Sequence, residues 1–163
     1  MWNLGNFYWR SFVALFLSTF INKVDKKGRV SVPATFRSTL ADQSYSGVVV
    51  FPSLVHPSVE GSGIDRFENL ADGVDNLNPF SDEHDDFSKA IFGQTHQLPF
   101  DSEGRIILPK PLVQHSQINE LAAFVGLGRT FQIWEPKKLQ KYESTALKRA
   151  REARSSLKLG KKE

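Results

Sequence analysis

Alternating apolar and polar residues predict two short strands near the start of the chain. Residues 16–24 (FLSTFINKV) and 29–32 (RVSV) are rich in apolar and β-branched side chains, which favour strands. Asp25 and Gly28 lie between them. An aspartate side chain can accept hydrogen bonds from the backbone just ahead of it, and glycine tolerates the positive φ of a tight turn. Pro33 cannot donate to a strand ladder. The pattern therefore predicts a β-hairpin that ends at Pro33.

The same pattern recurs 76 residues later. VDKKGRVSVP (24–33) and FDSEGRIILP (100–109) share Asp, Gly, Arg and Pro at matching positions, and their apolar residues are in register. Weaker similarity continues, because both stretches are followed by a helix-forming and then a strand-forming segment. Each half is therefore predicted to fold as strand, tight turn, strand, short helix and strand. A second proline, Pro111, predicts that the helix of the second half is shorter or begins later.

The segment between the halves, residues 52–93, is predicted to contain turns and then two helices. Residues 52–63 are rich in proline and glycine, which favour turns. Residues 64–77 carry apolar side chains at helical spacing, and Ser81 with the acids behind it is typical of a helix start. Farther on, residues 125–136 predict a hairpin that turns at Gly126–Gly128. From Pro136 onward, an apolar stripe predicts a helix whose other faces are basic; its members are Leu139, Tyr142, Ala146, Ala150, Ala153 and Leu157.

Composition and charge narrow the class of protein. The chain has 163 residues, 40% of them hydrophobic, which is typical of a globular protein with a modest core. It contains no cysteine, which excludes disulfides and thiol chemistry and favours a cytoplasmic location. Residues 60–87 carry a net charge of −8 and residues 137–163 a net charge of +7, although the whole chain carries only +3. Such asymmetry is compatible with a polyanionic partner, and equally with a solvated basic helix face.

The repeated turn is the strongest candidate for chemistry. Arg29 follows the first turn directly, and Lys26 and Lys27 lie on it. One interpretation is structural: Asp25 and Arg29 form a local ion pair that holds the hairpin. The other is functional: a two-stranded ribbon carries arginine to base edges and lysine to phosphates. In the second copy Ser102 and Glu103 replace the two lysines, so we expect that copy to contribute less to DNA binding.

The two motifs, VDKKGRVSVPATFR and FDSEGRIILPKPLV, resemble the signature copies of the MraZ family, and the resemblance covers about residues 15–140. It implies an α+β fold built from tandem AbrB-like swapped-hairpin β-barrel halves with short helices and a C-terminal helix. It divides the chain into an extension (1–14), a first repeat (15–66), an acidic helical linker (67–93), a second repeat (94–138) and a basic tail (139–163). One interpretation of residues 1–14 is a misplaced start codon, since family chains usually begin near the equivalent of Leu15.

The resemblance also implies a function, a set of partners and a location. Members bind short direct repeats upstream of their own division and cell-wall operon, which they typically repress. They assemble into rings and are cytoplasmic and nucleoid-associated. Double-stranded DNA and further copies of the chain are therefore the expected partners, with no membrane, cofactor, metal or small-molecule substrate. The implied DNA-binding residues are Arg29, Lys27, Lys26, Arg105 and Arg37, and the turns depend on Asp25, Gly28, Asp101 and Gly104.

Two other classes of function stay open at this level. A metal-dependent hydrolase would have to use His84, Asp85, Asp86 and His96, but consecutive residues do not share a helix face and no zinc-type spacing occurs. No Ser-His-Asp or Cys-His arrangement can be identified, and each of the spread histidines, His56, His84, His96 and His115, is expected at the surface or as a capping residue. An assembly protein would instead use its basic tail to bind an acidic partner or, without sequence preference, nucleic acid.

Overall fold

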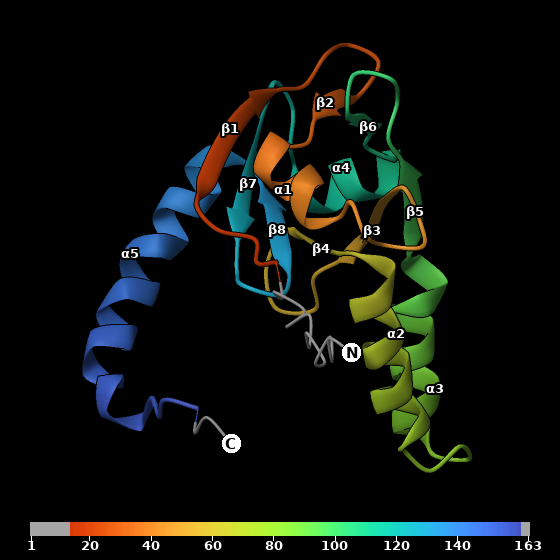
Figure 1. Ribbon diagram of the computed structural model, residues 1–163. Coiled ribbons are helices and arrows are strands. Elements are labelled where there is room, and N and C mark those ends of the chain that lie inside the picture. The colour runs from red at the N-terminus through yellow and green to blue at the C-terminus, as the bar shows by residue number, and fades with distance from the viewer. Residues whose placement is uncertain (1–13, 161–163) are drawn as a thin grey trace, which may run out of the picture.

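The computed structural model describes residues 14–160; the predictions made for residues 1–13 fall outside this range. Within it, the chain forms two halves with the same order of elements: two strands, a helix and two more strands (Figure 1). The first half contains β1 (Thr19–Lys23), β2 (Arg29–Ser31), α1 (Ala34–Thr39), β3 (Gly47–Pro52) and β4 (Val59–Ser62). The second contains β5 (His96–Pro99), β6 (Arg105–Ile107), α4 (Lys110–Ser116), β7 (Leu121–Gly126) and β8 (Phe131–Trp134).

The six-stranded sheet is symmetric between the halves. Its order is β1-β7-β8-β4-β3-β5, with every neighbouring pair antiparallel. Since β1 corresponds to β5, β7 to β3 and β8 to β4, the order reads the same from both edges after the halves are exchanged. The remaining strands, β2 and β6, pair with each other. The two edge strands and the β2–β6 pair are thus all bonded across the halves. The division into two repeats, a linker and a tail remains a prediction.

The prediction of a hairpin between the first two strands was wrong. β1 pairs with β7 and β2 pairs with β6. Between the two predicted arms there is one isolated bridge, Val24 with Val30, and a 2.7 Å bond from Asn22 Nδ2 to the Ser31 carbonyl. The residue pattern identifies a strand by its buried face but carries no information on which edge bonds to it. Val30 pairs with its counterpart Ile106, and both are 1% exposed. Burial of this pair explains why the partner comes from the other half.

Two other predictions need correction. Residues 59–62 were assigned to turns, but they form β4 at the centre of the sheet, where Val59 is buried and a Cβ at Gly61 would overlap the Phe131 ring. The sequence of β4, VEGS, contains a single apolar side chain and therefore does not predict a strand. Its extended conformation is instead set by pairing with β8. The helix of the second half is not shortened: α4 has seven residues against six in α1. Pro111 lies in its first turn, where a missing N–H is tolerated.

A single core joins the halves. Phe36 of α1 is fully buried and its ring contacts those of Phe16, Phe20, Phe124 and Phe131, with centroids 5.2–6.3 Å apart. Its counterpart in α4, Leu112, is 1% exposed in the same cluster. The core therefore lies between the two short helices and the sheet, and it positions the loops at one end of the molecule.

The predicted longer helices are confirmed. α2 (Ile64–Asp75) and α3 (Asp82–Ala90) follow the first half, and the Ser81 hydroxyl accepts a 3.1 Å bond from the His84 N–H at the start of α3. A 3₁₀ turn (Phe92–Gln94) leads into β5. α5 (Pro136–Glu152) starts where predicted, followed by a 3₁₀ turn (Arg154–Ser156). Leu157, the last residue of the predicted apolar stripe, lies beyond the helix.

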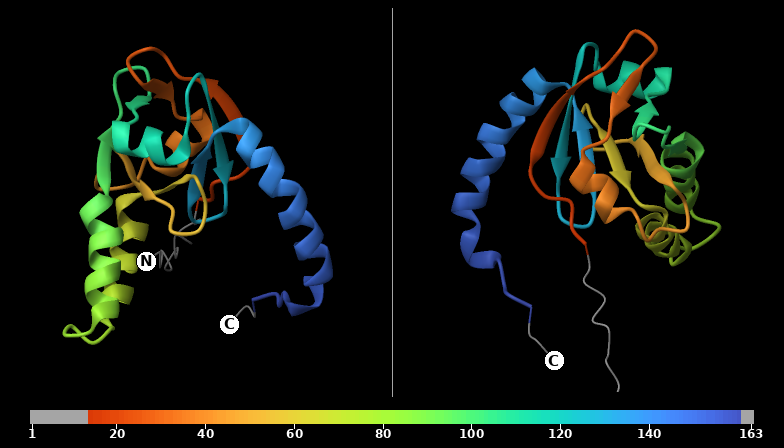
Figure 2. Two further views of the ribbon diagram at one scale, coloured as in Figure 1. Left: turned by 180° about the vertical axis from the view of Figure 1, so that it is seen from behind. Right: turned by 45° about the horizontal axis from the view of Figure 1, so that its top comes forward.

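The longer helices form two arms on opposite sides of the body, α2 with α3 on one side and α5 on the other (Figure 2). Leu139 anchors α5, because it is buried against Ala123 and Trp134. Among residues 14–160, none of the helices has both the length and the apolar character needed to span a bilayer.

Candidate nucleic-acid interface

The first turn is held by the side chain of Asp25. Its Oδ1 accepts 2.9 Å bonds from the backbone N–H groups of Lys27 and Arg29, and its Oδ2 accepts a 2.5 Å bond from Arg29 Nε. The Gly28 N–H donates to the Asp25 carbonyl, and Gly28 has a φ of +79°. Lys26 and Lys27 are exposed on this turn. One carboxylate thus fixes both the path of the backbone and the direction of the arginine.

The second turn repeats this geometry. Asp101 Oδ1 accepts 2.9 Å bonds from the N–H groups of Glu103 and Arg105, and Oδ2 accepts a 2.7 Å bond from Arg105 Nε. Gly104 has a φ of +74° and donates to the Asp101 carbonyl. The roles predicted for Asp25, Gly28, Asp101 and Gly104 in the turns are therefore present in the geometry. The ion pairs between Asp25 and Arg29 and between Asp101 and Arg105 are present too. The motif therefore has the structural role of holding the turn, whatever else it does.

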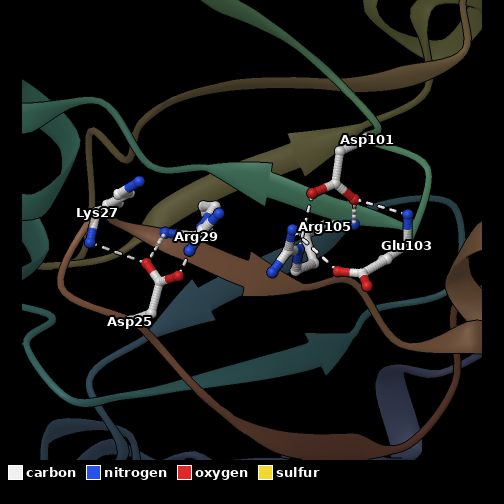
Figure 3. A network of polar contacts seen from close by, with 6 residues as sticks. All are labelled: Asp25, Lys27, Arg29, Asp101, Glu103 and Arg105. Atoms are coloured by element: carbon white, nitrogen blue, oxygen red, sulfur yellow. Dashed lines mark hydrogen bonds and ion pairs between the residues drawn. The ribbon is translucent and has the colours of Figure 1, made fainter.

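The β2–β6 ribbon brings the two turns together, as Figure 3 shows. Arg29 pairs with Ile107 and Ser31 with Arg105, so these four side chains share the outer face, while Val30 and Ile106 lie beneath. The arginines are diagonal neighbours, a relation that places Cα atoms about 7–8 Å apart in antiparallel pairs. Hydrogen bonds extend the ribbon into both turns, because Val32 N–H donates to the Gly104 carbonyl and Leu108 N–H to that of Gly28.

Two residues on the outer face of the β2–β6 ribbon were not predicted from the sequence. Ile107 is 59% exposed beside Arg29, and Ser31 is exposed beside Arg105. The usable signal for Ile107 was its alignment with the polar Ser31 in the repeat, because residues 106–108 are all apolar. Their pairing across the ribbon had no signal in the sequence, because it depends on a contact between segments 76 residues apart.

The two arginines differ in how many acids hold them. Arg105 bonds to Asp101 through Nε and to Glu103 through Nη2 at 2.9 Å, whereas Arg29 bonds to Asp25 through Nε alone. Within residues 14–160, the two terminal nitrogens of Arg29 make no hydrogen bond or ion pair. Residues 25–29 carry a net charge of +2, and residues 101–105 a net charge of −1. The first turn thus presents unpaired cationic groups, whereas in the second turn two acids outweigh the single arginine.

Arg37, the fifth predicted DNA-binding residue, lies at the second turn although it belongs to the first half. Its Nε donates a 3.2 Å bond to the Val32 carbonyl, and its guanidinium covers Gly104 so closely that a Cβ there would overlap it. The corresponding residue of α4 is Val113, so the first turn has no such neighbour. The structure therefore places Arg37 against Gly104, in the second turn.

Hydrogen bonds shift the pKa of charged side chains in both turns. The Arg29 backbone N–H, helped by the Arg29 guanidinium and the Lys27 N–H, holds the pKa of Asp25 below its ordinary value against a smaller effect of burial. The Arg105 N–H lowers the pKa of Asp101 in the same way. The bond from Arg105 to Asp101, with further attraction from Glu103 and Asp25, raises the pKa of Arg105. Both aspartates are therefore acceptors at neutral pH.

Residues proposed for metal chemistry are not assembled. His84, Asp85 and Asp86 are consecutive in α3 and His96 lies in β5. The described part of the chain contains no group of three or more histidine, aspartate or glutamate side chains placed to hold a metal ion.

The fold and this ribbon define an internally duplicated α+β protein with two arginine-bearing turns on one exposed face. Comparison with known proteins identifies the family. The family model described as MraZ protein matches residues 91–159. A protein of Pelagibacter ubique named transcriptional regulator MraZ is 48% identical over 88% of this chain and 93% of its own length. Proteins of the same name from Rickettsia canadensis and Rickettsia bellii are 46% and 44% identical, over 88% of this chain and 96% of theirs. The chain belongs to the MraZ family, which consists of transcriptional regulators rather than enzymes.

Proposed function

We propose that this protein is a sequence-specific DNA-binding regulator of transcription that contacts DNA through the β2–β6 ribbon, and mainly through its first turn. One observation carries the proposal. The terminal nitrogens of Arg29 are unpaired within residues 14–160, and they lie on a turn that Asp25 holds rigid and that exposes Lys26 and Lys27. The name that the relatives carry, transcriptional regulator, supports the same class.

The chemistry of the turn fits a duplex. The major groove admits a two-stranded ribbon, and an arginine with two free nitrogens can donate to both acceptors on a guanine edge. Lys26 and Lys27 supply phosphate contacts that set the register and add affinity. Arg105 and Arg37 contribute less in this proposal, because Arg105 is shared by two acids and Arg37 donates to Val32.

Weak single contacts require several copies. We propose that the protein assembles into a ring whose copies each present one ribbon to short direct repeats upstream of its own division and cell-wall operon, which it represses in the cytoplasm at the nucleoid. Linked contacts add through effective concentration, so each ribbon can bind weakly. The exchange of strands between the halves is compatible with the tandem AbrB-like swapped-hairpin fold, which is part of this proposal.

An alternative is an assembly protein that binds nucleic acid without sequence preference through its basic tail. The observation that favours it is the exposure of every residue from 140 to 160, a segment rich in lysine and arginine. This alternative predicts binding that depends steeply on salt and is indifferent to sequence.

The test is fluorescence anisotropy with labelled DNA from upstream of the gene and a scrambled duplex, at physiological salt. Three proteins are compared: the parent, Arg29→Ala, and Lys141→Ala as a control that removes one positive charge from α5. Tight binding of the upstream DNA alone by the parent and Lys141→Ala, lost in Arg29→Ala, supports the proposal. Equal binding of both duplexes by all three proteins would overturn it in favour of the basic tail.

A further inference from the structure

The two arms carry equal and opposite charge. From Ile64 to Ala90, the arm formed by α2 and α3 holds eight acidic residues and two basic ones, a net charge of −6. From residue 136 to residue 160, α5 and the turn behind it hold eight basic residues and two acidic ones, a net charge of +6. All eight acids are exposed, and all the cations but Lys138 are exposed. Charges of this size on opposed surfaces attract and orient partners.

The arms cannot neutralise each other within one chain. They project from opposite sides of the sheet, and both views of Figure 2 keep them apart. The acidic arm is fastened to the body by Phe67, whose ring lies 6.1 Å from that of Phe51 and 5.6 Å from that of Phe92. The basic arm is fastened by Leu139 and by Tyr142, whose ring lies 5.2 Å from that of Trp134. Each arm thus holds its charge at a defined place, facing outward.

Each arm also exposes apolar side chains among its charges. A shallow hollow beside α3 is lined by Leu54, Phe87 and Ala90 together with the acids Glu83 and Asp86. Leu54 is 55% exposed and Phe87 37%. On α5, Leu147 is 54% exposed with Lys148 beside it and Arg151 one turn farther on. An apolar residue flanked by cations on one arm therefore matches an apolar hollow flanked by acids on the other.

We infer that α5 of one copy of this chain binds the α2–α3 arm of a second copy, with Leu147 in the hollow beside Phe87 and with Lys148 and Arg151 against Glu83 and Asp86. The contact joins two different surfaces, so every added copy leaves one basic and one acidic arm free, and association continues until the chain of copies closes. In Figure 1 both arms extend away from the end that holds the β1–β2 and β5–β6 turns, so assembly through them leaves the ribbons accessible.

This inference rests on the self-association in the proposed function and is independent of DNA recognition. The test uses charge reversal in the full chain, followed by sedimentation velocity. One variant, Glu83→Lys with Asp86→Lys, makes the hollow basic; the other, Lys148→Glu with Arg151→Glu, makes the helix acidic. Each should weaken self-association by roughly tenfold or more, because attraction is lost and repulsion replaces it. Asp72→Lys with Asp75→Lys is the matched control, with the same charge change on α2 away from the hollow, and it should have the smaller effect.

Recombining the reversed surfaces gives the decisive readout. The two defective variants mixed together should assemble in alternation, because the unchanged α5 of one attracts the unchanged hollow of the other and the two reversed surfaces also attract each other. All four substitutions in one chain should restore parental assembly. Circular dichroism verifies folding of each variant. The inference is overturned if the parent sediments as a single copy, if the reversed variants assemble like the parent, or if the quadruple variant stays dissociated.

DNA binding by the same variants separates this inference from the proposed function. Both reversed variants keep Lys26, Lys27 and Arg29, so each should still prefer the upstream duplex, with the loss of affinity expected from fewer linked copies. If the α5 reversal abolishes DNA binding but leaves assembly unchanged, α5 is a nucleic-acid contact and the inference is wrong. If assembly responds as expected while Arg29→Ala binds DNA normally, the inference about the arms stands and the proposed role of Arg29 in DNA recognition is wrong.

Discussion

The turns at residues 25–29 and 101–105 have the same backbone and opposite electrostatics. In each, one aspartate accepts two backbone N–H groups and the arginine side chain four residues on. The first turn adds two lysines, while the second adds Glu103, which takes a second bond from its arginine. Duplication thus preserved the residues that shape the turn and let those that face solvent diverge. A residue's place in the hydrogen-bond network, rather than its place in the motif, decides whether it is available to a ligand.

The largest expected difference between the turns lies in their arginines. Arg29→Ala should weaken binding to the specific site by about 1–3 kcal/mol for each ribbon engaged, the usual contribution of a bidentate contact to guanine. Arg105→Ala should cost clearly less, because Asp101 and Glu103 already hold that side chain. Titration of upstream DNA by anisotropy gives both values. Equal losses for the two variants would contradict the asymmetry.

Substituting the two glycines tests whether an added side chain costs the same stability in both turns. Gly28→Ala and Gly104→Ala should each destabilise the fold by about 1–2 kcal/mol, because both positions have positive φ. Gly104→Ala must also displace Arg37, whereas the nearest atom to a Cβ at Gly28 is the Leu108 carbonyl oxygen at 3.3 Å. Chemical denaturation measures both. In an Arg37→Ala background the excess cost of Gly104→Ala should vanish, and its persistence there would show that Arg37 is not the cause.

Exchanging the solvent-facing residues should move the DNA affinity from one turn to the other. Ser102→Lys with Glu103→Lys gives the second turn the charges of the first and frees the Arg105 Nη2 from Glu103. Affinity should rise, and the dependence of log K on log salt should steepen by about 0.9 for each additional phosphate that the protein neutralises. The reciprocal change, Lys26→Ser with Lys27→Glu, should make it shallower. An unchanged salt slope in both variants would place phosphate binding elsewhere on the molecule.

The smallest expected effect is the response of the turns to acid. Since folding lowers the pKa of Asp25 and Asp101, the stabilisation is complete above the ordinary aspartate value of about 3.9 and is lost as pH falls through the lower folded values. Carboxyl chemical shifts followed by NMR during an acid titration give the folded values directly. Asp25→Asn should remove the contribution of the first turn to acid sensitivity and leave that of the second. A variant with the parent's pH dependence would mean that this carboxylate is uncoupled from folding.

Local sequence alone determined most of the elements and the geometry of the turns. Asp25, Gly28 and their counterparts act within four residues of one another, so their hydrogen bonds follow from the motif itself. The helix start at Ser81, the hairpin at Gly126–Gly128 and the start of α5 are similarly local. The duplication was also visible, because two ten-residue stretches share their identities in register.

The tertiary structure alone decided how the copies pair. A strand pattern specifies a buried face but not a partner edge, so the exchange of β1, β2, β5 and β6 between the halves could not be predicted from periodicity. The same holds for β4, whose short polar sequence becomes a strand only against β8. It holds as well for Arg37, which reaches Gly104 because the core packs α1 of one half beneath the turn of the other. Contacts between distant segments are set by the burial of side chains such as Val30 and Ile106, and burial is a property of the whole fold.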